Sequence, residues 1–418
     1  MNSWSATELF RQTPLFDGHN DLAAALRGKF GYSVDGLSTV QDQLHTDVEK
    51  LRRGGLGAQF WSVWVPSHLV EEAAVVATLE QIDAVYRLVA QYPDVFGFAR
   101  TAADVERVFA SGRIASLMGV EGGHAIAESL GVLQMFARLG VRYMTLTHND
   151  DTAWAASATG LRQTTGLNEM GKAIVAEMNR IGIIVDLSHT SESTQLDAFA
   201  ATSAPVIFSH SSARAVTDHP RNVSDHVLSK VGANGGVVQV TFVPEFVSQR
   251  CLDWEAEMIA QRASLGLEEV RPPHRSVVSA QESQFPAAPK PGESAASTKL
   301  RNAAQPTIDS DTCASAALAA QIDRWLEANP SPQSTLRDVA DHVDHVREVA
   351  GIAHVGIGGD FDGTPSVTVG LENVSMYPAL FDELASRGWS RADAQKLAGE
   401  NVLRVLREAE EAASGFIA

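Results

Sequence analysis

The chain has 418 residues, of which 44% are hydrophobic and 20% are charged, a balance typical of a globular protein with a large core. Acidic residues outnumber basic ones by 51 to 33, giving a net charge of −18, which argues against a nucleic-acid-binding protein and against attachment to anionic lipid by charge. No signal-peptide pattern and no run approaching the ~20 apolar residues of a membrane span is visible, so we expect a soluble cytoplasmic protein.

Short apolar runs alternate with helical patterns along almost the whole chain. The runs predict eight strands: Leu15–Gly18, Gly57–Val65, Ile114–Glu121, Val141–His148, Gly182–His189, Pro205–His210, Gly235–Val243 and His354–Asp360. Apolar residues at helical spacing predict helices between most of them, including Val70–Gln91, Leu130–Leu139, Asn168–Ile181, Tyr377–Arg387 and Ser390–Ala412. Eight such units predict an α/β fold, a (β/α)8 TIM barrel that forms a single domain over residues 1–418.

One segment, residues 244–311, breaks this rhythm between the seventh and eighth strands. It is polar and interrupted by prolines, and a structureless loop of this length is unusual in a compact domain. Two interpretations stay open: a lid over the catalytic face of the barrel, and a surface excursion away from it. The only cysteines, Cys251 and Cys313, lie near its ends. We expect two free thiols, although a disulfide between them would staple the segment.

Reactive side chains gather where the predicted strands end. His19 and Asp21 are two residues apart, so in an extended chain they point to the same side and can hold one cation. Further strand ends carry Glu121, His148, His189, His210 and Asp360. Functional groups in these barrels lie at the C-terminal ends of the strands. A single histidine could be an ordinary core residue, but that interpretation does not explain reactive side chains at so many strand ends. Imidazoles and carboxylates suit zinc, and this set is larger than one zinc requires. We therefore expect two metal ions.

Six segments, in order, resemble the renal (membrane) dipeptidase family of zinc metallopeptidases. They are Asp17–Asp21, Gly119–His124, Asp186–His189, Phe208–Ser211, His219–Asn222 and Gly358–Gly363. The resemblance implies a (β/α)8 barrel of the metal-dependent hydrolase type with a binuclear zinc site. It further implies dipeptide hydrolysis, tolerance of a D-residue at the C-terminal position and, in some members, opening of β-lactam rings. The mammalian members are secreted and lipid-anchored, and the lack of such signals here favours a microbial member.

The resemblance also implies how two zinc ions would be held. His19, Asp21 and Glu121 would hold one ion, while Glu121, His189 and His210 would hold the other. Glu121 would thus bridge the pair. A water shared by two zinc ions loses a proton near neutral pH, which would supply a bridging hydroxide as the nucleophile.

Three more matched residues would act on the substrate. His148 would steady the scissile carbonyl oxygen as negative charge develops on it, and Asp360 would carry the proton to the leaving amine. Arg221 would bind the substrate carboxylate, for which its planar guanidinium is suited; Arg214 is an alternative clamp. We interpret the remaining polar neighbours as structural: His124, His219 and Asp362.

These features predict a metal-dependent dipeptidase acting on short dipeptides with a free C-terminal carboxylate. Two alternatives remain. The first is another amide hydrolase on the same site, acting on β-lactams or N-acyl amino acids, and the second is a metal-bearing protein that holds a peptide without cleaving it. The expected partner is a small dipeptide, with neither nucleic acid nor membrane. The oligomeric state stays open, a homodimer included.

Overall fold

The computed structural model describes residues 4–69, 71–266 and 312–415, the side chains of 312–319 excepted. Its centre is a parallel sheet in the order β2-β1-β9-β8-β7-β6-β5-β4-β3, and β2 also pairs with β4. The strands are β1 (Leu15–Asn20), β2 (Leu56–Trp64), β3 (Phe96–Phe98), β4 (Ile114–Glu121), β5 (Val141–Thr145), β6 (Ile184–Asp186), β7 (Ile207–Phe208), β8 (Val237–Val240) and β9 (Val355–Ile357). Because β2 meets β4, all strands but β3 close into a barrel, which confirms the predicted fold class.

β3 is a strand that the sequence pattern did not predict, because three residues are too few to show a period. It pairs with the first half of β4, with Phe96 beside Ile114. From Met118 onward the same side of β4 is taken by β5. β3 therefore lies outside the closed ring of eight.

Several strands end earlier than predicted. β5, for example, ends at Thr145, so His148 lies in the loop that follows. His189 and Asp360 have φ values of 65° and 60°, in the left-handed region that no strand residue occupies. These turns place His189 and Asp360 after the last residues of β6 and β9, at the C-terminal end of the barrel. Backbone strain of this kind is concentrated at functional sites in proteins.

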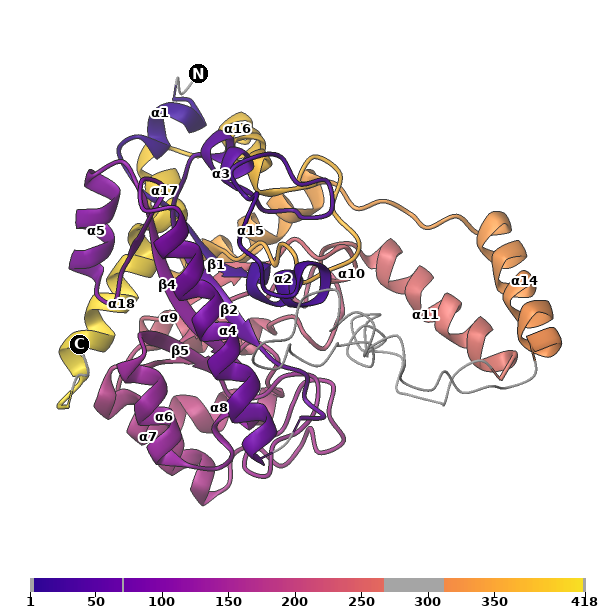
Figure 1. The fold of residues 1–418 in the computed structure, drawn as a ribbon, viewed down its shortest axis with the longest axis horizontal. Coiled ribbons are helices and arrows are strands. Elements are labelled where there is room, and N and C mark those ends of the chain that lie inside the picture. The colour runs from indigo at the N-terminus through magenta and orange to yellow at the C-terminus, as the bar shows by residue number, and fades with distance from the viewer. Residues whose placement is uncertain (1–3, 70, 267–311, 416–418) are drawn as a thin grey trace.

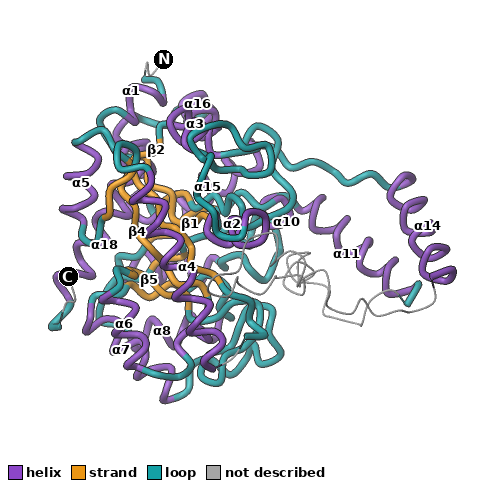
Figure 2. The backbone as a smooth tube through the Cα atoms, in the orientation of Figure 1, coloured by secondary structure: helices purple, strands orange, loops and turns teal. Residues whose placement is uncertain are grey.

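Helices enclose the strands on the outside (Figure 2). Those nearest the barrel are α2 (Leu22–Phe30), α4 (Glu71–Gln91), α5 (Ala102–Ala110), α6 (Leu130–Arg138), α7 (Glu169–Ile181), α8 (Glu192–Ala201), α9 (Asp225–Asn234), α15 (Leu336–Ala350) and α18 (Asn401–Ala412). Shorter helices are α1 (Ala6–Phe10), α3 (Val48–Gly54), α16 (Tyr377–Ser386) and α17 (Arg391–Gln395). The expected first residue of α4, Val70, lies outside the described part of the chain.

α7 illustrates why these segments are helical. The Asn168 side chain accepts a hydrogen bond from the N–H of Gly171 and caps the start. Gly182, at φ 77°, ends the helix in a left-handed conformation that glycine adopts without penalty. Between these caps, Ile174, Val175 and Met178 bury one face against the barrel.

The segment predicted as a structureless loop contains two helices, α10 (Pro244–Val247) and α11 (Gln249–Ser264). That prediction was wrong for residues 244–264, which contain no proline after Pro244 to interrupt a helix. α11 and α14 (Thr312–Ala328) project away from the barrel (Figure 1). The rings of Trp254 and Trp325 lie 6.0 Å apart and connect the two helices. Residues 267–311, to which the lid interpretation also applies, lie outside the described residues.

The Cys251 thiol is free and donates to the carbonyl oxygen of Pro332 at 3.4 Å. The side chain of Cys313 is not among those described. Among the helices of the described ranges, none is both long and apolar enough to cross a membrane.

Candidate metal centre

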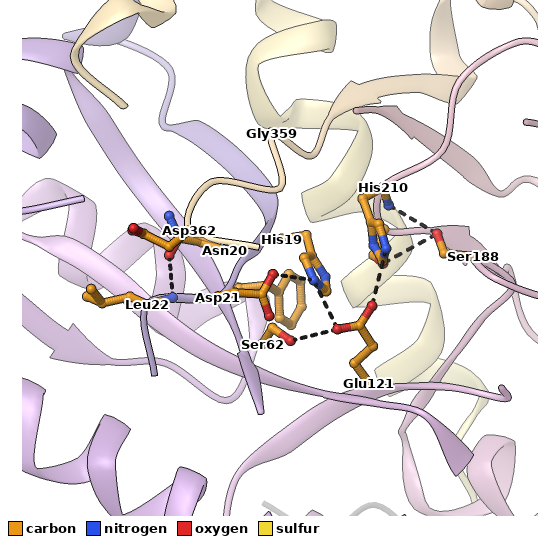
Figure 3. A network of polar contacts seen from close by, with 12 residues as sticks. His19, Asn20, Asp21, Leu22, Ser62, Glu121, Ser188, His210, Gly359 and Asp362 are labelled. Carbon is orange, nitrogen blue, oxygen red and sulfur yellow. Dashed lines mark hydrogen bonds and ion pairs between the residues drawn. The ribbon is translucent and has the colours of Figure 1, made fainter. Parts of the chain in front are cut away.

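Glu121, the last residue of β4, lies between histidines that reach it from other strands (Figure 3). Its Oε1 is 2.9 Å from His189 Nε2 and 3.3 Å from His210 Nε2. Its Oε2 is 3.4 Å from His19 Nε2, and His19 Nε2 is in turn 3.2 Å from Asp21 Oδ2. The two carboxylate oxygens thus face two different sets of ligand atoms, which is the geometry that a bridge between two cations requires.

The spacing of these atoms suits a metal. Ligand atoms bound at 2.0–2.2 Å to one tetrahedral zinc are about 3.3–3.6 Å from each other. Within the described residues, His19 Nε2 and Asp21 Oδ1 are buried without a hydrogen-bond partner. Such atoms are costly unless something binds them, and a cation at this place would satisfy both. The donor set of imidazoles and carboxylates fits zinc.

Three overlapping groups of possible ligands can be drawn from the described residues: His19 with Glu121 and His210; Glu121 with His148 and His189; and His19 with Asp21 and Asp360. The first two are buried and share Glu121, which indicates a binuclear metal site. These groups place His148 and Asp360, expected to act on the substrate, beside the expected ligands. These groups differ from the two ligand sets that the resemblance implies, because His210 lies with His19 here, whereas the resemblance pairs it with His189.

The electrostatics of Glu121 and His19 favour a cation between them. Burial raises the pKa of Glu121, but His19, His189 and His210 outweigh it and hold the pKa well below its ordinary value. Burial lowers the pKa of His19, yet Tyr143, Glu121 and Asp21 outweigh it and raise the pKa well above its ordinary value. The protein therefore stabilises positive charge at the position of His19 Nε2, where a metal cation would lie.

His189 and His210 behave in the opposite way. Burial lowers the pKa of both rings well below the ordinary value, and Arg221 contributes to both shifts. The Nε2 atoms of the two rings lie 2.9 Å apart. Neutral imidazoles are the form that binds metal, so these two residues are ready to coordinate.

Asp21 and Asp360 converge from opposite ends of the chain. A Cβ atom added at Gly363 would lie 2.3 Å from Asp21 Oδ2 and 2.4 Å from Asp360 Oδ1, so only glycine allows the two carboxylates to approach. Burial raises the pKa of Asp360 well above its ordinary value, and the negative charges of Asp21 and Glu121 add to this effect while His19 opposes it. Asp360 can therefore hold a proton beside the centre.

Arg221 lies behind His210. Its Nη2 donates to the carbonyl oxygen of His210 at 3.3 Å and its Nη1 to the Ser211 hydroxyl at 3.4 Å. Burial lowers its pKa to about 10, so it stays a cation at neutral pH. Among the described residues, no carboxylate forms an ion pair with Arg221, and its buried Nε has no hydrogen-bond partner. The guanidinium also lies 5.4 Å from the centre of the Phe246 ring of α10.

The other predicted candidates have structural contacts. Arg214 donates to the carbonyl oxygens of His219 and Pro220 and thereby holds its own loop. His219 Nδ1 accepts from the backbone N–H of Arg221 at 3.1 Å, and His124 Nε2 lies 3.1 Å from the carbonyl oxygen of Val65.

Asp362 forms a reciprocal pair with His45. Asp362 Oδ1 accepts from the His45 backbone N–H at 2.8 Å, and the Asp362 N–H donates to His45 Nδ1 at 3.0 Å. The pair fastens the loop after β9 to the loop before α3.

Sequence patterns did not identify the residues that support the ligands. The Tyr143 hydroxyl lies 2.9 Å from His19 Nδ1, and the Ser209 hydroxyl lies 2.8 Å from His210 Nδ1. The rings of Trp64 and His148 lie 5.5 Å apart, edge to face. Strand residues such as Tyr143 look like ordinary core residues in the sequence, whereas Ser209 directly precedes an expected ligand, His210, which is the one available signal.

Comparison with known proteins identifies the family. The family model for "Membrane dipeptidase (Peptidase family M19)" matches residues 4–416. This chain belongs to the membrane dipeptidase family. Membrane dipeptidases of family M19 are metallopeptidases that hydrolyse dipeptides, so the enzyme class and the expected family are confirmed.

Two known proteins are similar to this chain over almost its whole length. Dipeptidase verJ of Clonostachys rogersoniana is 38% identical over 98% of this chain and 88% of its own length. The crystal structure of the probable dipeptidase PvdM from Pseudomonas aeruginosa has a TM-score of 0.75 at 26% identity, covering 97% of this chain and 98% of the other.

A third relative shares the fold. It is a metallo peptidase from Rhodobacter sphaeroides, solved with a phosphinate mimic of the dipeptide L-Ala-D-Ala. Its TM-score is 0.70 at 22% identity, and the match covers 95% of this chain and 99% of the other.

Proposed function

We propose that this membrane dipeptidase family member hydrolyses dipeptides with a free C-terminal carboxylate at a centre of two zinc ions, and accepts a D-residue at the C-terminal position. The observation that carries the proposal is the buried Arg221 guanidinium, which has no carboxylate partner among the described residues. An unpaired buried charge is costly. A substrate carboxylate would pair with it when the substrate binds.

The position of Arg221 supports a limit on substrate length. Arg221 donates to the backbone of His210, while the His210 ring reaches Glu121. The clamp and the expected reactive centre thus contact the same residue, His210, from its backbone and from its ring. A carboxylate held by Arg221 would place the peptide bond just before it at the centre, which is the arrangement in a dipeptide.

The protein residues would then divide the chemistry. His19, Asp21 and Glu121 would hold one zinc, and Glu121, His189 and His210 the other. When bound, two zinc ions lower the pKa of water and polarise a carbonyl group. Two further residues would act on the substrate: His148 on the charge that develops on the carbonyl oxygen, and Asp360 on the proton that passes to the leaving amine.

His148 would donate a hydrogen bond to the carbonyl oxygen as negative charge develops on it. Asp360, in its carboxylate form, would accept the proton of the attacking water; because burial and its negative neighbours raise its pKa, it could hold that proton and deliver it to the leaving amine. The tolerance of a D-residue is supported by the ligand of the Rhodobacter sphaeroides relative, a mimic of L-Ala-D-Ala.

The test is a dipeptide panel with L- and D-residues at the C-terminal position, each as free acid and as C-terminal amide. We expect turnover of the free acids with two zinc ions per chain, loss of activity with a chelator and recovery with zinc. Arg221→Ala should raise KM about 10- to 100-fold for free acids, the range for a lost charged hydrogen bond, and little for amides. Arg214→Ala, on the same loop, is the matched control.

Turnover of β-lactams or N-acyl amino acids in place of dipeptides would favour the alternative amide hydrolase. Binding of a dipeptide without product, with two zinc ions present, would contradict the proposal.

A further inference from the structure

A chain of hydrogen bonds runs behind His210, on the side away from Glu121. The Ser209 hydroxyl lies 2.8 Å from His210 Nδ1 and donates to Asp186 Oδ2 at 2.6 Å. All three side chains are buried. Asp186 is the last residue of β6, and Ser209 directly follows β7, so the contact depends on neighbouring strands of the barrel.

The direction of the protons in this chain follows from the surroundings of Asp186. Its Oδ1 accepts from the backbone N–H groups of Ser188 and Ser209, and its Oδ2 accepts from the hydroxyls of Thr145 and Ser209. Four donors surround the carboxylate. Because the single hydroxyl proton of Ser209 goes to Asp186, the Ser209 oxygen must accept from Nδ1–H of His210. The Nε2 lone pair of His210 then faces Glu121.

His19 has a different support. Its Nδ1 faces the Tyr143 hydroxyl, which donates to the carbonyl oxygen of Gly18 at 3.3 Å. Here a neutral phenol and a backbone carbonyl occupy the place that Ser209 and a carboxylate occupy behind His210. The two expected metal sites therefore differ in how the protein supports their histidines.

We infer that Ser209 and Asp186 are positioning residues that fix the proton of His210 on Nδ1 and thereby control how tightly the metal facing Nε2 is held. This inference rests on the proposed two-zinc centre. A carboxylate-backed acceptor fixes the tautomer and ring orientation of a ligating histidine and raises its basicity; loss of such a partner typically costs 10- to 100-fold in metal affinity.

Thr145 provides a matched control. Its hydroxyl donates to the same Asp186 oxygen, also at 2.6 Å. Thr145→Val therefore removes one hydrogen bond from Asp186 and keeps the side-chain shape. Ser209→Ala removes an equivalent bond and, in addition, the acceptor for His210. The difference between the two variants isolates the contribution of the link to His210.

Asp186→Asn tests the proton direction itself. In this variant the backbone N–H groups that donate to Oδ1 require an oxygen at that position. The amide nitrogen therefore takes the position of Oδ2 and donates to the Ser209 hydroxyl. Ser209 must then donate to His210 Nδ1, which places the ring proton on Nε2, where the metal should bind. This variant should hold metal more weakly than Ser209→Ala, although it preserves the shape of the carboxylate.

The experiment measures zinc release from the zinc-loaded enzymes to a chelator of known affinity, with thermal unfolding as a check of folding. We expect the more weakly held zinc to bind about 10- to 100-fold less tightly in Ser209→Ala, within about threefold of wild type in Thr145→Val, and least tightly in Asp186→Asn.

Equal zinc affinities of Ser209→Ala and Thr145→Val would overturn the inference. Zinc held by Asp186→Asn as tightly as by Ser209→Ala, in folded protein, would overturn the proton direction. If Asp186→Asn fails to fold, the comparison of Ser209→Ala with Thr145→Val still decides. A wild-type enzyme that does not bind two zinc ions would instead contradict the proposed function.

Discussion

The guanidinium of Arg221 lies 5.4 Å from the centre of the Phe246 ring. Phe246 comes from α10, which begins the segment between β8 and β9, whereas Arg221 comes from the loop after β7. The aromatic face supports the buried cation from one side. The start of the inserted segment thus reaches Arg221, the proposed substrate clamp, while α11 and α14 project away from the barrel (Figure 1).

Replacing Phe246 should loosen this clamp. Phe246→Ala removes the ring from Arg221, and we expect KM for free-acid dipeptides to rise about 5- to 30-fold with kcat within about threefold, equivalent to ~1–2 kcal/mol of lost cation–π contact. Phe246→Tyr, which keeps the aromatic face, should behave like wild type. Steady-state kinetics separates the two constants. A fall in kcat at unchanged KM would contradict the assigned support of Arg221.

Gly363 should tolerate no side chain. The Cβ of Gly363→Ala would lie 2.3 Å from Asp21 Oδ2 and 2.4 Å from Asp360 Oδ1, so both carboxylates would have to move. We expect activity to fall at least about 100-fold, since displacement by ~1 Å at a catalytic group costs this much. Gly28→Ala is the control, because nothing lies within 4 Å of its added Cβ. Full activity of Gly363→Ala would show that the two carboxylates do not act together.

Glu121→Gln should lower the number of zinc ions that the centre holds. The pKa of Glu121 lies well below its ordinary value because His19, His189 and His210 outweigh the effect of burial, so the group acts as a carboxylate with two oxygens. An amide offers one oxygen, and its nitrogen cannot bind a cation. We expect fewer than two zinc ions per chain by elemental analysis and about 100-fold or greater loss of activity. Two tightly bound zinc ions in this variant would argue against a bridging role.

His342 should make the fold sensitive to acid. It is fully buried on α15; its Nδ1 accepts from the Ala213 N–H at 3.0 Å, and its Nε2 lies 3.3 Å from the carbonyl oxygen of Val247. Burial lowers its pKa to about 4, with His345 adding to the shift while Val247 and Asp338 oppose it. In the unfolded chain the pKa returns to about 6.5.

Between these two values the unfolded chain binds more protons than the folded one, so stability falls as the pH falls from about 6.5 toward 4. The loss of folding free energy that results from His342 reaches about 3 kcal/mol at pH 4. Urea unfolding of wild type and His342→Asn at pH 7 and pH 5 should show the wild type losing more stability on acidification. Parallel losses would show that His342 titrates normally in the folded protein.

The barrel and the cluster of possible metal ligands were predictable because both leave local signals. A buried parallel strand is an apolar run, and the expected ligands His19 and Glu121 and the expected proton carrier Asp360 lie at the ends of such runs. β3 was not predictable because three residues show no period. Phe246 and Tyr143 were not identified. The sequence around an aromatic residue does not show which polar group its side chain contacts in the folded protein.

Asp17 shows the same limit within a recognised motif. Its carboxylate accepts from the N–H of His19 at 2.7 Å and from the N–H of Gly359 at 3.1 Å. It therefore fastens the first segment of the chain to the last one. The motif around His19 was recognised from its neighbours in sequence, but the partner of Asp17 lies in the final strand's loop and is visible only in the folded barrel.

The pairing of β1 with β9 has a consequence for how the enzyme is made. Asp360 donates from its backbone N–H to the carbonyl oxygen of His19 at 3.2 Å, so the first and last parts of the centre meet only when the ring of strands closes. During synthesis the N-terminal ligands leave the ribosome long before Asp360 exists. A nascent or truncated chain therefore cannot assemble the whole centre, and a cation that binds only the closed barrel stabilises the finished protein selectively. The centre is thereby incomplete until the chain through Asp360 has been synthesised.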